Sequence, residues 1–304
     1  MPYLLLLAYM IPRTTCIVTT KLNSSSFSAF GLTGSLLYTL ETSIFSLPVY
    51  WIAAGCTLAL NSTVWMYGAL YGICSFACLI LAVFMYNHGS VTLVNFVSST
   101  VTLIASSAFG AILLGEEITP ALILRVSLML ICVLTLFLGS DRSEGAAVRK
   151  KRFNPLSILL PAIYALFGLG ATFIIKYFTA DAAATDTNSL FFVVNVFGAV
   201  YSIPMILISA KKDKLRAREV VGICTDKRTS YAAVNTLFGG VQAIITALLI
   251  ASMEVSLYTP VVTALGFICM AIATPIVRER LDRYNIAATA IAIASLFLPM
   301  LIFG

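Results

Sequence analysis

Long apolar runs separated by short polar stretches make up almost the whole chain. Each run is about 20 residues long, the length that an α-helix needs to cross a bilayer core of about 30 Å. Membrane β-barrels instead show alternating segments of about ten residues. The pattern therefore predicts an all-α, polytopic membrane protein. Its ten transmembrane helices are expected over residues 3–21, 28–53, 63–86, 91–114, 119–139, 155–178, 188–210, 231–253, 257–277 and 283–303.

The two halves of the chain resemble each other. Residues 4–21 align with residues 159–176, and five spans lie on each side of a basic linker. An odd number of spans per repeat turns the second copy upside down, which predicts an inverted 5+5 repeat with a site near the midplane. The matched residues of the first pair of spans are Tyr9 with Tyr164, Arg13 with Gly168, and Lys21 with Lys176.

This duplication divides the chain into three parts. Residues 1–140 form the first five-helix repeat, residues 141–154 the basic linker and residues 155–304 the second repeat. The division places one copy of the charged first span, with Arg13, opposite a copy that has glycine at the equivalent position.

Composition and charge support a membrane protein. Hydrophobic residues make up 60% of the chain and charged residues 11%, against about 25% charged in soluble domains. The net charge is +6, and 16 of the 19 lysines and arginines lie in or near the loops after the odd-numbered spans. The positive-inside rule explains this distribution better than nucleic-acid binding does, and it places both termini outside the cell.

Several short motifs resemble those of the drug/metabolite transporter superfamily, specifically its ten-helix EamA-like members. They are the 5+5 duplication, the two lysines near the ends of matched spans, and two short segments, Gly115–Thr119 and Tyr258-Thr259-Pro260. The resemblance implies a carrier of small metabolites or drugs that works by alternating access across the bacterial plasma membrane, as an exporter. It also implies that both termini lie inside, opposite to the charge count.

One position departs from the superfamily pattern. Its four-helix multidrug members carry a membrane carboxylate eight residues before the lysine of the first span. Counting back eight residues gives Arg13 from Lys21 and Gly168 from Lys176. The departure argues against cation–proton exchange by that carboxylate.

Ionisable residues inside the spans are the sharpest candidates for a site, because a charge at the bilayer centre costs roughly 2.5–3.5 kcal/mol. Arg13 follows Pro12 and either binds an anionic substrate or pairs with Glu41, which is itself also a candidate proton-coupling carboxylate. Amides and tyrosines of other spans either face the same cavity or serve helix packing. The candidate cavity residues are Tyr9, Arg13, Glu41, Asn95, Tyr164, Asn195, Asn235 and Gln242.

Other charged residues near span ends have simpler interpretations. Arg125 is expected to reach back to Glu116 and Glu117, and Lys176 to end its helix at the membrane interface. Glu116 is expected to favour the N-terminus of the helix that follows it. With one histidine and no nucleotide-binding or protease motif, the sequence predicts no metal, cofactor or catalytic residue.

These features favour a secondary transporter that moves a small organic solute, anionic or zwitterionic, through a central cavity between the repeats. The alternatives are a non-transporting membrane receptor or scaffold and a membrane enzyme that acts on lipid-like substrates. The expected partners are the substrate and the bilayer, with no nucleic acid, and the protein is a monomer or a homodimer.

Overall fold

The structure is a computed structural model, and it describes residues 2–27, 31–88, 91–143, 155–181, 186–212, 222, 229–276 and 283–303. Within these ranges the chain is all-helical and contains no strand. The ten helices are α1 (Pro2–Phe27), α2 (Gly31–Ala53), α3 (Ser62–His88), α4 (Val91–Leu114), α5 (Pro120–Ser143), α6 (Leu156–Ala180), α7 (Thr187–Lys212), α9 (Thr229–Ser252), α10 (Val255–Ile276) and α11 (Arg283–Phe303).

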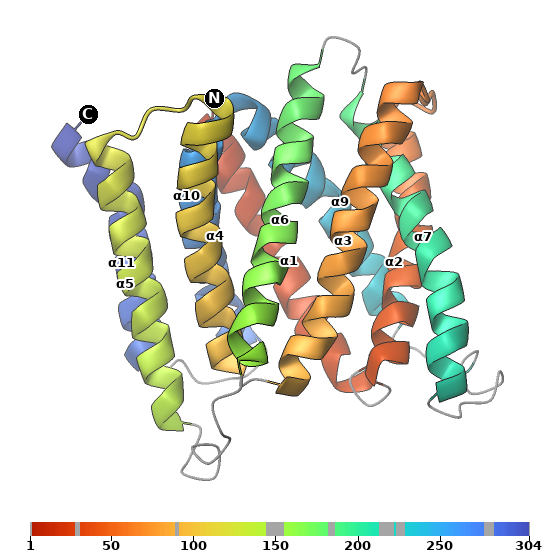
Figure 1. Cartoon of the computed structure of the whole chain (residues 1–304), viewed down its shortest axis with the longest axis horizontal. Helices are drawn as coiled ribbons and strands as arrows, with labels where there is room; N and C mark the ends of the chain where they lie inside the picture. The colour runs from red at the N-terminus through yellow and green to blue at the C-terminus, as the bar shows by residue number, and fades with distance from the viewer. Residues whose placement is uncertain are drawn as a thin grey trace.

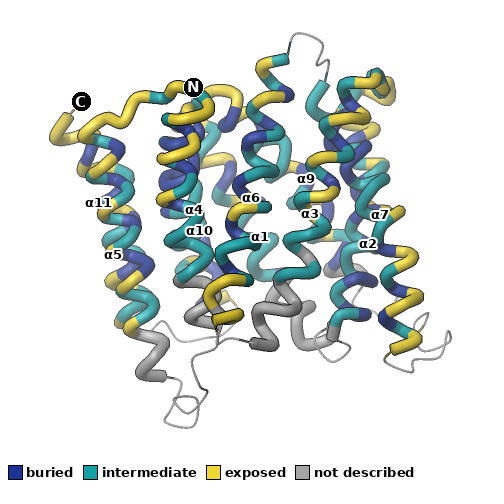
Figure 2. The backbone as a smooth tube through the Cα atoms, viewed as in Figure 1, coloured by how far each residue is buried: buried dark blue, intermediate teal, exposed yellow. Residues whose placement is uncertain are grey.

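Each predicted span overlaps one of these helices. Seven of the helices in the described ranges are long and apolar enough to cross a membrane, judged by length and composition. Exposed residues occur along much of the length of the helices (Figure 2), and many of them are large apolar residues. An apolar outer surface suits a hydrocarbon environment. Helices suit it too, because they satisfy their own backbone hydrogen bonds where no water is present. The fold is that of an integral, multi-pass membrane protein.

The helices form a long bundle with a pair at each end. Helices α5 and α11 pack together at one end, and α2 and α7 pack together at the other (Figure 1). Between them, α6 packs against α3 and α4, while α1 packs against α9 and α10. Both termini lie at the same face of the bundle (Figure 1).

A buried aromatic cluster lies where helices of the two halves meet. Tyr9, Tyr50, Phe191 and Tyr258 belong to one hydrophobic cluster. The rings of Tyr50 and Phe191 have their centroids 5.3 Å apart. Aromatic pairs at this spacing stabilise a core beyond the area they bury. Tyr9, which the sequence presented as a cavity or packing residue, is 3% exposed and packs in this cluster.

Candidate functional site

The first-span arginine lies inside the bundle, in a helix that continues through Pro12. Arg13 is half-buried, and its Nε is fully enclosed without a hydrogen-bond partner. The guanidinium is close enough to Tyr9 and Cys269 to influence them electrostatically. It also acts on Tyr258 of α10 in this way. Arg13 therefore belongs to the contact between α1 and α10.

The sequence suggested Glu41 of the second span as one possible partner of Arg13. Helix α1 packs mainly against α9 and α10 and less extensively against α2. Glu41 is 9% exposed on α2, and no hydrogen bond joins the Nε of Arg13 to either of its carboxylate oxygens.

The amide residues divide between local and interhelical roles. Asn235 Oδ1 accepts a hydrogen bond from Thr19 Oγ1 at 2.8 Å, and its Nδ2 donates to the hydroxyl of Tyr38. Asn235 thus joins α9 to α1 and α2, the packing role that was one of its two interpretations. Asn195 Nδ2 donates to Phe191 O, one turn back in its own helix, at 2.8 Å.

Two amide candidates remain. Gln242 Nε2 of α9 lies 3.5 Å from the Tyr9 hydroxyl, a long hydrogen bond that connects two predicted candidates. Asn95 belongs to α4, but its side chain lies outside the part of the chain that the structure describes. The structure thus groups Tyr9, Arg13 and Gln242 around α1, whereas Asn235 and Asn195 are engaged elsewhere.

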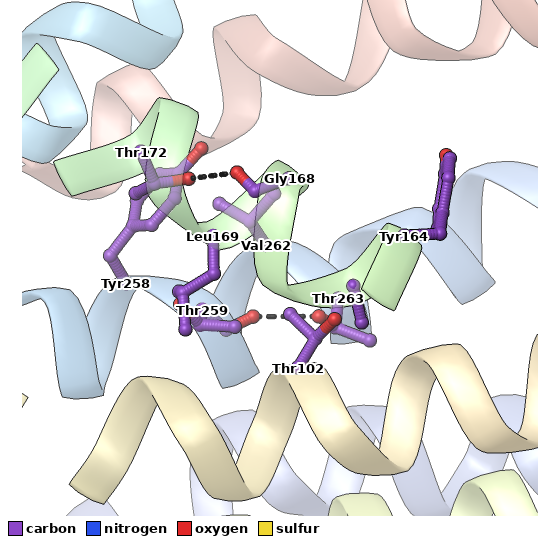
Figure 3. Close-up of a pocket in the computed structure, with 10 residues that line it drawn as sticks. Thr102, Tyr164, Gly168, Leu169, Thr172, Tyr258, Thr259, Val262 and Thr263 are labelled. Carbon is purple, nitrogen blue, oxygen red and sulfur yellow. Dashed lines mark hydrogen bonds between the residues drawn. The ribbon is translucent and has the colours of Figure 1, made fainter. Parts of the chain in front are cut away.

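A cavity of about 190 Å³ lies between α4, α6 and α10, at a contact between the two halves of the chain (Figure 3). Among the described residues ten line this cavity, and six of them carry hydroxyl groups, so we call it the hydroxyl-lined cavity. Its lining residues are Thr102, Tyr164, Ala165, Gly168, Leu169, Thr172, Tyr258, Thr259, Val262 and Thr263.

Three of the threonines in this wall use their hydroxyl protons within their own helices. Thr172 donates to Gly168 O at 3.3 Å, Thr263 donates to Thr259 O at 2.7 Å (both drawn in Figure 3), and Thr259 donates to Val255 O at 3.0 Å. A hydroxyl has one donor and two acceptor lone pairs. Once its proton is used in this way, it offers only acceptors to a ligand.

Gly168 creates space in this wall. It occupies the position that matches Arg13 in the internal alignment, and a Cβ atom added there would meet nothing within 4 Å. Tyr258, another wall residue, is also within the electrostatic influence of Arg13. The threonine part of the cavity wall is therefore neutral and offers hydrogen-bond acceptors, and the charge of Arg13 acts on Tyr258 of the same wall.

Of the predicted candidates, Tyr164 is in this wall, and the threonines were missed. The signal that could have found them is their spacing. Thr259 and Thr263 are four residues apart, which places them on one face of a helix. Tyr258 and Thr259 were noticed only as part of a family motif.

The turn between α9 and α10 is held from both sides by charged side chains. Lys176 Nζ of α6 donates to Ile250 O at 2.9 Å and to Met253 O at 2.6 Å, at the C-terminus of α9. The Glu116 carboxylate accepts from the backbone N–H of Val255 at 2.6 Å and of Ser256 at 2.8 Å, at the N-terminus of α10. A cation at a C-terminus and an anion at an N-terminus both complement the helix dipole.

The contacts of these charged residues differ in part from what was expected. Glu116 serves the N-terminus of α10, not that of α5. Lys176 lies near the end of α6, as expected, and also binds the end of α9. Arg125, which was expected to reach back to Glu116 and Glu117, is 8% exposed, and its Nε donates to Ser295 O of α11 at 3.1 Å.

Gly115 determines where Glu116 points. Its φ of 67° lies in the left-handed region that glycine tolerates and that commonly ends helices. The N–H of Glu116 then bonds back to Gly110 O at 3.2 Å. The segment Gly115–Thr119, quoted above as a family motif, therefore ends α4 and directs a carboxylate toward α10.

No protein-family model and no curated protein matches the chain. A solved crystal structure is similar with a TM-score of 0.67, and the alignment covers 96% of each chain at 17% sequence identity. A likeness at that identity shows the fold alone, so the chain shares its fold with that structure over nearly the whole length of both.

Proposed function

We propose that this protein is a secondary transporter, which moves a small polar organic solute across the membrane by alternating access. The observation that carries the proposal is the hydroxyl-lined cavity at a contact between the two halves of the chain, because ligand sites are concave and are lined by apolar side chains together with a few placed polar groups. The cavity lies between α4 of the first half and α6 and α10 of the second half. Its place suits a site that is opened from one face and then from the other.

The packing of the helices supports an inverted 5+5 repeat. In such a repeat, α1, α3 and α4 of the first half correspond to α6, α9 and α10 of the second half. The pair α3–α6 then corresponds to α9–α1, and the pair α4–α6 to α10–α1. All four of these pairs pack together. The pairs α2–α7 and α5–α11 turn into themselves and also pack together. Repeats of this kind are common in carriers, where rocking of one repeat against the other exposes a fixed site to each side.

The walls favour a solute with both donors and a negative charge. Threonine hydroxyls that donate within their own helices offer acceptors, which suit ammonium or hydroxyl groups of a ligand. Arg13, whose charge acts on Tyr258 of the wall, favours a carboxylate on the solute. An amino-acid-like zwitterion satisfies both conditions, and we propose this class of solute, with export as the direction implied by the family resemblance.

The experiment uses three matched sets of compounds on purified protein. Free amino acids, their N-acetyl derivatives and their amides provide zwitterions, anions and cations of similar size. We expect zwitterions to raise the thermal unfolding temperature most, and the best of them to show saturable counterflow into liposomes that contain the protein. Absence of counterflow for all three sets, with folded and reconstituted protein, would reject the proposal.

Two glycine variants connect transport to the cavity. In Gly168→Leu the new side chain fills the hydroxyl-lined cavity, so binding and counterflow should be lost. Gly266→Leu is the matched control, because its Cβ also meets nothing within 4 Å and it lies outside the cavity wall. Equal activity of the two variants would show that the solute uses another route.

A further inference from the structure

The first turn of α10, residues 255–259, carries two wall residues of the hydroxyl-lined cavity, Tyr258 and Thr259 (Figure 3). This turn is held by a side chain from outside its own helix, because the N–H groups at its start donate to the Glu116 carboxylate. The end of the preceding helix, α9, is held in the same way by Lys176 of α6. The wall residues therefore stay in place through contacts made by two distant segments of the chain.

The connection between this turn and the rest of α10 is weak. Pro260 has no N–H, so Ser256 O lacks the donor that residue 260 supplies in a regular helix, and a proline inside a helix permits a bend. Ser256 is only 1% exposed, and its Oγ is enclosed with no hydrogen-bond partner among the described residues. A buried polar group without a partner costs free energy. The turn is therefore not in an arrangement that satisfies all of its own polar groups.

An apolar cluster closes the hydroxyl-lined cavity beneath this turn. Val255 of the turn is buried together with Leu169 and Phe173 of α6, and Leu114 at the end of α4 packs against them. Leu169 also lines the cavity, whereas Lys176 lies three residues beyond Phe173. From the cavity, these residues of α6 lead toward the face of the bundle that holds both termini (Figure 1). The cavity is thus closed toward that face.

Space for a movement of the turn lies on another face of α10. A second cavity, of about 260 Å³, has walls from α1, α5, α10 and α11. Nine of the ten described residues that line it are apolar, so we call it the apolar cavity. From α10 it is lined by Leu257, Val261 and Leu265, which are four residues apart and share one face of the helix. Because protein interiors are close-packed, a helix shifts only where there is such space.

We infer that residues 255–259 form a lid, which closes the hydroxyl-lined cavity toward the face of the two termini and opens by bending at Pro260 into the apolar cavity. Release of the two N–H groups by Glu116 is the step that frees the lid. Interfaces of this kind switch between discrete arrangements and do not deform continuously. What the lid admits rests on the transport function proposed above, whereas its movement does not.

The test measures how fast an impermeant methanethiosulfonate reagent modifies Thr263→Cys, a wall position one turn beyond the lid, in a background without native cysteines. Membrane vesicles of both orientations are used, and a protease-cleavable tag at the C-terminus shows which face meets the reagent. Glu116→Ala should raise the rate by about tenfold or more at the face of the termini, because the loss of charge-assisted hydrogen bonds shifts the lid toward its open position. Leu296→Trp, which fills the apolar cavity from α11, should lower the rate and cancel the acceleration in the double variant.

Each variant has a matched control. Glu117→Ala removes an exposed charge beside Glu116, and Leu298→Trp places the same bulky side chain on α11 at a position that does not line the apolar cavity. Both should react at the rate of the unaltered protein.

The inference is overturned if Glu116→Ala reacts no faster than Glu117→Ala, if the acceleration is equal at both faces, or if Leu296→Trp reacts as Leu298→Trp does. If Leu296→Trp fails to fold, Leu6→Trp fills the apolar cavity from α1 and decides by the same criterion. The labelling needs no solute. Failure of the lid is thereby distinguished from failure of the transport proposal, which depends on counterflow.

Discussion

The carboxylate of Glu116 gives the sharpest test of how this bundle is held together. It accepts two backbone N–H groups at the start of α10, although it belongs to the segment after α4. Replacing it by alanine removes both acceptors and the negative charge at the helix N-terminus. The neighbouring Glu117 is exposed, so Glu117→Ala changes the net charge by the same amount at almost the same place.

The expected magnitude follows from these contacts. Hydrogen bonds to charged groups contribute about 1.5–3 kcal/mol each, and loss of an N-cap costs about 0.5–2 kcal/mol. Glu116 is only half-buried, so water replaces part of what is lost. We therefore expect Glu116→Ala to lower the free energy of unfolding by about 2–3 kcal/mol, and Glu117→Ala to change it by less than about 0.5 kcal/mol.

The assay is reversible unfolding in mixed micelles, followed by circular dichroism during a titration with sodium dodecyl sulfate. The free energy of unfolding of Glu116→Gln should lie between those of Glu116→Ala and Glu117→Ala. Its amide oxygen can accept one of the two N–H groups, but its NH₂ group presents a donor to the other. If Glu116→Ala and Glu117→Ala unfold at the same detergent fraction, the carboxylate does not cap α10.

Four further predictions concern other parts of the molecule. Gly110→Ala should lower unfolding stability, and combine less than additively with Glu116→Ala, because its new Cβ would meet the Glu116 carboxylate; full additivity would show that the two positions are independent. Lys176→Met should lower stability by about 1–3 kcal/mol through the loss of two donations to the end of α9, measured by the same titration, and an unchanged midpoint would contradict this. Arg13→Lys should weaken zwitterion binding in thermal-shift titrations and Arg13→Ala should abolish it, since an ammonium does not reproduce the planar fork of a guanidinium; binding that survives in Arg13→Ala would remove the residue from the site. Cysteines placed at positions 143 and 213 in a background without native cysteines should react with an impermeant thiol reagent only after lysis, as the loop charge predicts, and labelling in intact cells would reverse the orientation.

The helices themselves were largely predictable from the sequence. The predicted spans 91–114 and 283–303 coincide with α4 and α11 at both ends. The first span was predicted to end at residue 21, whereas α1 continues to Phe27. The end of an apolar run marks where a segment leaves hydrocarbon, but a helix stops only where its backbone hydrogen bonds stop, and no proline or glycine interrupts residues 22–27.

The partners of the site residues were not predictable in the same way. Helices that are apolar on all sides carry little information about which face meets which neighbour. Glu116 and Val255 are 139 positions apart, and Lys176 reaches α9 across 77 positions to Met253. Sequence indicated correctly that these charges lie near helix ends, but their choice of helix depends on the packing of the whole bundle.

In the transport cycle proposed above, the threonine hydroxyls of the hydroxyl-lined cavity have a consequence for the part in which no solute is bound. Because Thr172, Thr259 and Thr263 already donate to their own helices, an empty cavity leaves none of these three protons unpaired. Unpaired buried donors cost about 1–3 kcal/mol each. A carrier of this kind can close its empty cavity without that free-energy cost. The step in which it returns without solute therefore need not be slower, for this reason, than the step that carries solute.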